Sequence, residues 1–71
     1  MEQIIEILKN ALGTDNINED TTKENCEEWD SFNHLVVIAD LERELAVEFT
    51  IEETERMDSI KEIYEIVKAK V

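Results

Sequence analysis

The sequence predicts an all-α protein built as a small helical bundle, and three features of the chain support this fold class. Apolar residues recur at the three- and four-residue spacings of a helix face in several separate stretches. The chain has no proline and no stretch that alternates apolar and polar residues as a strand does. Its 71 residues leave room for one domain, so residues 1–71 are taken as a single unit. We therefore expect a four-helix bundle with three longer helices and one short third helix.

The first predicted helix ends at Gly13, because a glycine just past an apolar periodic stretch often takes the left-handed conformation that closes a helix. From Thr14 to about Asp30 the pattern changes to Asn, Asp, Glu and Thr, with Ile17 and Trp29 as the only large apolar residues. A loop this long in so small a domain is either functional or contains a turn of its own. We expect Trp29 to pack over the end of the bundle. The predicted buried face of the first helix comprises Ile4, Ile5, Leu8, Ala11 and Leu12.

Two short motifs predict where the last two helices begin. Residues 50–53 (TIEE) have the form in which Thr50 caps the helix and Glu53 reaches back to the cap. The short helix that follows should end near Met57. Residues 59–62 (SIKE) repeat the motif with Ser59 and Glu62 at the start of the last helix. The predicted buried face of that helix comprises Ile60, Ile63, Tyr64 and Val67.

The second helix, predicted from Ser31 to Leu45, has two apolar faces. A step of about 100° per residue places one group of apolar residues on a face that a single core can bury. A small bundle needs only one such face, so the second face either packs under the long loop or the short helix, or docks a partner with Arg43 at its edge. The expected core face comprises Val37, Ile38, Leu41 and Leu45, and the second apolar face comprises Phe32, Leu35, Val36 and Ala39.

Composition limits the possible partners and the compartment. With 19 acidic and 7 basic residues, the formal charge of −12 and the lack of a basic cluster argue against binding to nucleic acid or an anionic membrane. Hydrophobic residues make up 42% of the chain and are periodic, which argues against disorder. The single cysteine, Cys26, excludes an internal disulfide and a multi-cysteine metal site. Because no stretch resembles a membrane span or a signal peptide, we expect a cytoplasmic protein. We also expect it to be a monomer without a metal site.

Ser31 begins the second helix within the stretch EWDSFNHL at residues 28–35. As a nucleophile it would need a general base, but the only histidine, His34, falls towards the core face and has no evident partner. We therefore predict no catalytic residue and no enzymatic activity. Asp30 would cap the helix as well as Ser31 would, and two adjacent capping residues suggest that they have different roles. Because a helix N-terminus favours negative charge, a phosphoryl group on Ser31 would be stabilised there.

The chain from Asp30 onwards resembles the acyl carrier proteins, in which a D-S-L motif opens the second helix. Here the motif reads DSF, and the helix continues into DLERELAVEFTIEETERMDSIKEIYEIV at residues 40–67. The correspondence runs without gaps from Asp30 to Val67, and the first helix and long loop fit the same plan. The resemblance implies that Ser31 carries a 4'-phosphopantetheine arm from coenzyme A. It also implies that Asp30 helps the transferase to place the serine and a metal ion.

The resemblance further implies that the thiol of this arm carries acyl groups as thioesters, and that Cys26 is not the carrier thiol. Its partners would be a phosphopantetheinyl transferase and the enzymes that load and transfer the acyl group. The chain has Asn33, Val36 and Arg43 where housekeeping fatty-acid carriers tend to have acidic contacts, which favours a specialised fatty-acid, polyketide or lipid pathway. The expected partner-binding residues are Phe32, Leu35, Val36, Ala39 and Arg43. The residues expected to shelter an apolar cargo are Ile38, Leu41, Ile60 and Ile63.

Several alternatives remain open at this point. Peptidyl, aminoacyl and D-alanyl carriers share the same plan. A second D-S-apolar motif, residues 58–60, is explained by its capping role. An acidic interaction module without any modification would fit the charge equally well. A calcium-binding module is disfavoured because Thr21 replaces the glycine of the sharp turn. The spacing that suggests a calcium loop involves Asn16, Asn18, Asp20, Thr22, Glu24 and Glu27.

Overall fold

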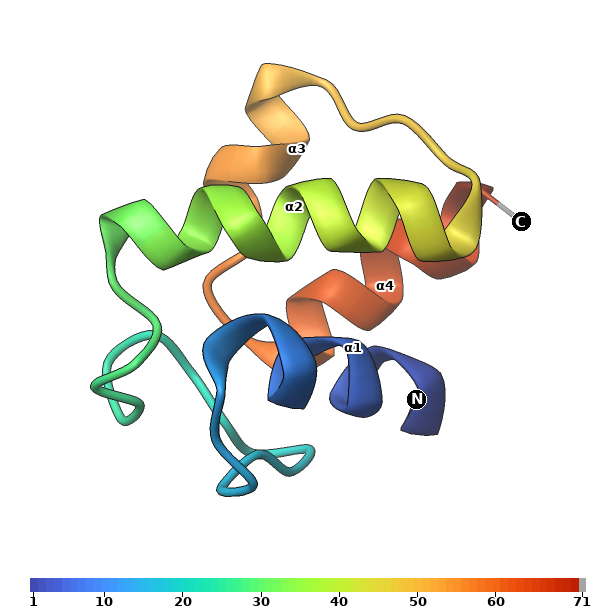
Figure 1. Ribbon diagram of the computed structural model, residues 1–71. Helices are drawn as coiled ribbons and strands as arrows, with labels where there is room; N and C mark the ends of the chain where they lie inside the picture. The colour runs from blue at the N-terminus through green and yellow to red at the C-terminus, as the bar shows by residue number, and fades with distance from the viewer. Residues whose placement is uncertain (71) are drawn as a thin grey trace.

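Residues 1–70, which the computed structural model describes, form four helices in the predicted order (Figure 1). They are α1 (Glu2–Leu12), α2 (Ser31–Leu45), α3 (Ile51–Arg56) and α4 (Ile60–Lys70). Within residues 1–70 the only β-type pairing is an isolated bridge between Thr22 and Ser59, and no strand is formed. The all-helical prediction is therefore confirmed. None of these helices has the length and apolar character that crossing a membrane requires.

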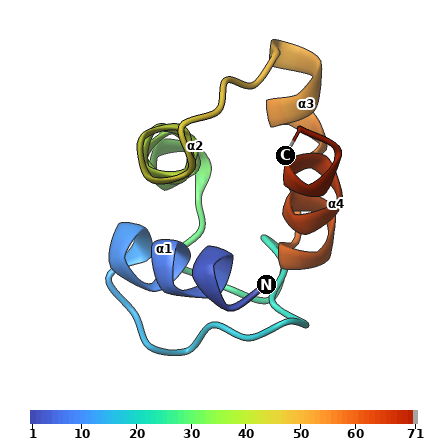
Figure 2. The same ribbon diagram turned by 90° about the vertical axis from the view of Figure 1, so that its right-hand side faces the viewer.

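The core lies between α1, α2 and α4. Figure 2 looks along α2 and shows α1 beneath it, with α4 and α3 across from it on the other side. The described chain measures 27 × 22 × 19 Å along its principal axes. Each large apolar side chain that is fully buried contributes about 1.5–3 kcal/mol relative to an exposed one. The largest fully buried side chains are Trp29, Leu8, Leu41, Met57, Ile60, Ile63 and Val37.

The buried faces of α1 and α4 are rotated relative to the predicted ones. In α1, Ile7 is buried, whereas Ile5 and Ala11 are only half-buried. Contacts with both α2 and α4 explain this, because α1 has to cover two neighbours. In α4, Ile66 is buried and Tyr64 is half-buried, with the Lys68 ammonium 5.5 Å from the centre of its ring. Tyrosine suits this border position because its ring packs while its hydroxyl stays wet.

Capping hydrogen bonds begin and end the helices close to the predicted positions. Gly13 has a φ of 67° and closes α1 in the left-handed conformation. The Thr50 and Glu53 capping box is complete, as predicted. The second box is only half formed, because the Ser59 hydroxyl accepts from the Glu62 backbone N–H at 3.1 Å while the Glu62 carboxylate pairs with Arg56 at 3.2 Å. The prediction of a full box at residues 59–62 was therefore wrong.

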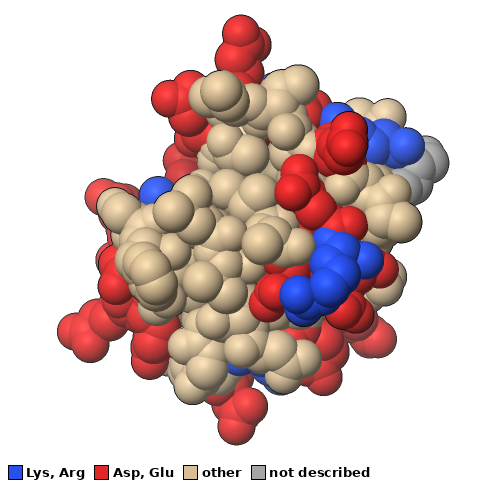
Figure 3. All heavy atoms as spheres, turned by 45° about the horizontal axis from the view of Figure 1, so that its top comes forward, with Lys and Arg blue, Asp and Glu red and all other residues tan. Residues whose placement is uncertain are grey.

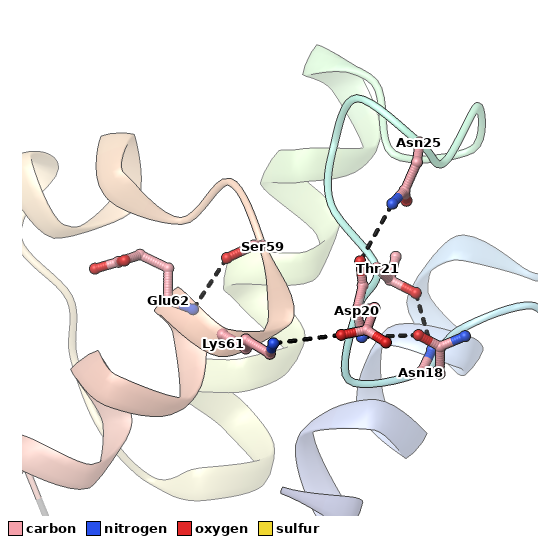
Figure 4. Close-up of polar contacts among 7 residues, drawn as sticks. All are labelled: Asn18, Asp20, Thr21, Asn25, Ser59, Lys61 and Glu62. Atoms are coloured by element: carbon pink, nitrogen blue, oxygen red, sulfur yellow. Dashed lines mark hydrogen bonds and ion pairs between the residues drawn. The ribbon is translucent and has the colours of Figure 1, made fainter.

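The long loop between α1 and α2 is fastened to the connection between α3 and α4. The Lys23 N–H donates to the Asp58 carbonyl at 2.9 Å, and the Ile60 N–H donates to the Thr21 carbonyl at 3.0 Å. An ion pair of 3.3 Å joins Lys61 on α4 to Asp20 in the loop (Figure 4). The loop therefore reaches α2 along a defined path, and this path sets the position of the residues just before Ser31.

Candidate functional site

Asp30 and Ser31 divide two roles at the start of α2. Asp30 has extended backbone, and its carboxylate accepts a hydrogen bond of 2.8 Å from the Asn33 N–H. Asp30 is thus the N-cap, and Ser31 is the first helical residue, with an exposed side chain. Within residues 1–70 the Ser31 hydroxyl has no hydrogen-bond partner, in contrast to Ser59, whose hydroxyl caps α4. The serine of the 30–32 motif is therefore exposed and does not cap α2.

The loop residues before the N-cap are held against α2 by further hydrogen bonds. The Asn33 side-chain amide donates to the Glu28 carbonyl at 2.8 Å, and the Trp29 N–H donates to the Cys26 carbonyl at 3.0 Å. Asn33 therefore binds both to the N-cap side chain and to the loop. These bonds hold the backbone of residues 26–29 next to the first turn of α2.

Trp29, His34 and Thr54 form a chain of hydrogen bonds from the loop through α2 to α3. The Trp29 indole, which is 2% exposed, donates to Nδ1 of His34 at 3.0 Å. An imidazole nitrogen that accepts carries no proton, so the proton lies on Nε2, which is 2.9 Å from the Thr54 carbonyl oxygen. Both ring nitrogens of His34 are thus occupied, and the ring cannot serve Ser31 as a general base. The expected packing of Trp29 at the end of the bundle is confirmed.

The second apolar face of α2 is largely open to solvent. Phe32 is 74% exposed and Leu35 is 66% exposed, Ala39 is exposed, and Val36 is half-buried. The alternative in which the second apolar face packs under the loop or against α3 is therefore wrong for Phe32 and Leu35. Figure 3 shows a broad area of uncharged side chains, bordered mainly by acidic side chains and, on the right, also by basic ones. Exposed large apolar side chains that lie close together on a small domain are candidates for an interaction surface.

Ile51 at the start of α3 is a third exposed large apolar residue, with 80% exposure. It was not among the predicted candidates, because it lies inside the TIEE motif, whose pattern was explained entirely by capping through Thr50 and Glu53. A usable signal existed: Thr54 and Glu55 follow one turn later, so Ile51 has no apolar partner on its own helix. We add Ile51 to the candidate partner-binding residues.

Arg43 lies on the exposed side of α2, with 67% of its side chain accessible. Its guanidinium is 2.8 Å from the Asp40 carboxylate and 3.4 Å from that of Glu44. Exposed ion pairs of this kind contribute about 0–1 kcal/mol, so their main effect here is on the surface charge. The positive charge of Arg43 is balanced by the carboxylates of Asp40 and Glu44 on the same helix.

The residues predicted to shelter an apolar cargo are part of the hydrophobic core or pack against it. Leu41, Ile60 and Ile63 are fully buried, and Ile38 is half-buried at the edge of α2. In this conformation they pack within the bundle. An apolar cargo would therefore have to displace side chains or separate helices to reach them.

Cys26 is buried in the loop, and its thiol donates to the Glu28 carboxylate at a sulfur–oxygen distance of 3.6 Å. Burial raises the pKa of the Cys26 thiol above its ordinary value, and the hydrogen bond to Glu28 raises it further. Because the thiolate is the reactive form, this cysteine is poorly suited to carry a thioester.

We expect Cys26 in the folded protein to react with iodoacetamide more slowly than in the urea-unfolded chain, by about tenfold or more. Both burial and the raised pKa lower the accessible thiolate at neutral pH. The rates can be followed by intact mass at one pH, with the unfolded chain as the control. Equal rates in the two states would contradict the protected position of this thiol.

The geometry of the long loop disfavours a calcium site, because other groups engage the candidate oxygen ligands (Figure 4). The Asn18 side-chain oxygen accepts from the Asp20 N–H at 2.7 Å, and the Thr22 hydroxyl oxygen accepts from the Asn25 N–H at 3.2 Å. The Asp20 carboxylate faces the ammonium of Lys61. Calcium would have to displace a lysine and break hydrogen bonds that shape the loop.

The comparisons with known proteins add no assignment: no model of a known protein family matches the chain, and no curated protein matches it. The structure shows a small helical protein with an exposed serine, Ser31, at the capped start of α2. The exposed apolar side chains of Phe32 and Leu35 lie beside it.

Proposed function

We propose that the protein is a carrier that holds acyl intermediates as thioesters on a 4'-phosphopantetheine arm attached to Ser31. The observation that carries this proposal is the free, exposed Ser31 hydroxyl directly after the Asp30 cap. A capping serine would be engaged with the helix, as Ser59 is. Here Asp30 takes that role, and the family resemblance of residues 30–67 points to the same serine.

The start of α2 suits the product of such a modification. The Ser31 oxygen would form a phosphodiester with the phosphopantetheine part of coenzyme A, and the nucleotide part would leave with its phosphate. The new negative charge would lie at the N-terminus of a helix of 15 residues, where unpaired N–H groups and the helix dipole stabilise anions. The separate transferase supplies the base, because both nitrogens of His34 are occupied.

The exposed apolar surface near Ser31 supports docking of the enzymes that modify, load and unload the arm. Phe32 directly follows the attachment serine, and Leu35 lies one turn further along α2. An enzyme that covers these side chains would bring its active site to the arm. The proposed cargo is an acyl group of a specialised fatty-acid, polyketide or lipid pathway. A peptidyl, aminoacyl or D-alanyl group is the alternative cargo. The proposed partner-binding residues are Phe32, Leu35, Val36, Ala39, Arg43 and Ile51.

The test is the intact mass after incubation with coenzyme A, magnesium and a broad-specificity phosphopantetheinyl transferase. We expect the parent to gain one phosphopantetheine and Ser31→Ala to gain none. Ser59→Ala is the matched control, because Ser59 also follows an aspartate but caps α4; it should be modified as the parent is. Circular dichroism would establish that each variant is folded.

A folded parent that gains no mass would contradict the carrier proposal. In that case an unmodified acidic interaction module becomes the better candidate, because the exposed side chains of Phe32, Leu35 and Ile51 would fit a partner surface without any arm.

A further inference from the structure

Polar contacts join helix α3 to α2 and α4. None of its residues, Ile51–Arg56, is buried. Met57, directly after the helix, is fully buried. A helix of six residues is far too short to be stable by itself. Its position therefore depends on these contacts and on the apolar residues that flank it, which are buried Met57 after the helix and Phe49 before it.

His34 binds the C-terminal end of α3. Its Nε2–H donates to the Thr54 carbonyl at 2.9 Å, across 20 residues of sequence. That carbonyl also accepts from the Met57 N–H at 3.3 Å, at the closing turn of α3. The Trp29 indole keeps the His34 proton on the nitrogen that faces α3. The buried indole of Trp29 thus keeps Nε2 of His34 protonated, and this N–H binds α3.

A second contact binds the other part of α3 to α4. The Lys70 ammonium is 2.9 Å from the Glu53 carboxylate, and both side chains are 24% exposed. The Glu53 carboxylate also accepts from the Thr50 N–H at 2.8 Å. These contacts lower the pKa of Glu53 below its ordinary value, with the Thr50 hydrogen bond as the largest cause and Lys70 as the next. The charged form of Glu53 therefore fastens α3 to α4.

We propose that α3 is a lid that opens as a unit while the other helices stay folded, and that His34 is its latch. The flanking connections, residues 46–50 and 57–59, would absorb the movement. Ala46 already has a positive φ of 55°, which alanine rarely adopts. Opening would expose Met57 and the neighbouring apolar interior. The inference concerns the unmodified chain and does not depend on a carrier function.

Amide hydrogen exchange measured by NMR tests the latch. The reporters are the amides of Thr54 and Met57, which bind the carbonyls of Thr50 and Thr54 within α3. In His34→Phe we expect them to exchange about three- to tenfold faster relative to the amides of α1 and α4, since one hydrogen bond of ordinary strength is lost. His34→Gln should stay close to the parent, because its side-chain amide can still donate to the Thr54 carbonyl.

Two further measurements separate a latch from a merely structural histidine. In the parent, the nitrogen chemical shifts of His34 should report a proton on Nε2. In Trp29→Phe, the two tautomers should mix, and the α3 reporters should exchange faster than in the parent but slower than in His34→Phe. If the reporters and the α1 and α4 amides change by the same factor in every variant, α3 does not open separately and the proposal is overturned.

The parent alone gives a second answer if the variants fail to fold. Increasing denaturant should leave the exchange of Thr54 and Met57 almost unchanged at low concentration, while exchange in α1 and α4 rises steeply. The same steep dependence for all these amides would overturn the lid.

Discussion

Trp29→Ala is expected to lower the free energy of unfolding by about 3–5 kcal/mol. Trp29 is 2% exposed and is the largest of the fully buried side chains. Its removal leaves a cavity at the end of the bundle and deprives Nδ1 of His34 of its donor. A domain of this length has about 4–11 kcal/mol of stability in total, so the expected loss ranges from about a quarter of this stability to all of it.

Urea unfolding followed by circular dichroism measures this effect without relying on tryptophan fluorescence. Trp29→Phe is the matched control, because it keeps most of the apolar volume and removes only the indole N–H and some packing. We expect it to lose about 1–2 kcal/mol, between the parent and the alanine variant. A Trp29→Ala protein within about 0.5 kcal/mol of the parent would contradict the central position of this side chain.

Helix boundaries could be predicted because the signals that set them are local. The predicted second helix, Ser31 to Leu45, is the observed α2, since the Asp30 cap and the apolar period both act within a few residues. The Thr50 capping box was found for the same reason. Ser59 shows the limit of such signals. Its predicted partner Glu62 is drawn to Arg56, a residue on the preceding helix that no local motif includes.

The contacts that give the candidate site its shape lie further apart along the chain. His34 was placed towards the core by periodicity, but its bond to Thr54 depends on how α3 packs. The exposure of Phe32 and Leu35 likewise depends on what α3 and the loop leave uncovered. Periodicity identifies an apolar face and cannot say whether another element will cover it. Ser31 was the exception, because its freedom follows from the residue directly before it.

Replacing Phe32 and Leu35 together with aspartate is expected to lower kcat/KM for modification by the transferase by about 30- to 1,000-fold. Exposed apolar side chains beside Ser31, the proposed attachment point, are the expected centre of the docking surface. The stability of the fold should change by less than about 1 kcal/mol, because neither side chain is buried. Initial rates and urea unfolding of the same preparations separate the two effects. The double variant Gln3→Asp with Asn10→Asp, at two exposed positions of α1, controls for the two added charges.

The dependence of the parent reaction on salt tests the chemical character of this docking. Contacts through Phe32 and Leu35 carry no charge, and Arg43 is balanced by Asp40 and Glu44. We therefore expect kcat/KM to fall only weakly with ionic strength, since screening acts on charge pairs and leaves apolar contacts intact. A steep fall with salt, together with normal kcat/KM in the double aspartate variant, would move the docking surface away from these residues. It would then lie among the acidic side chains that surround the apolar area in Figure 3.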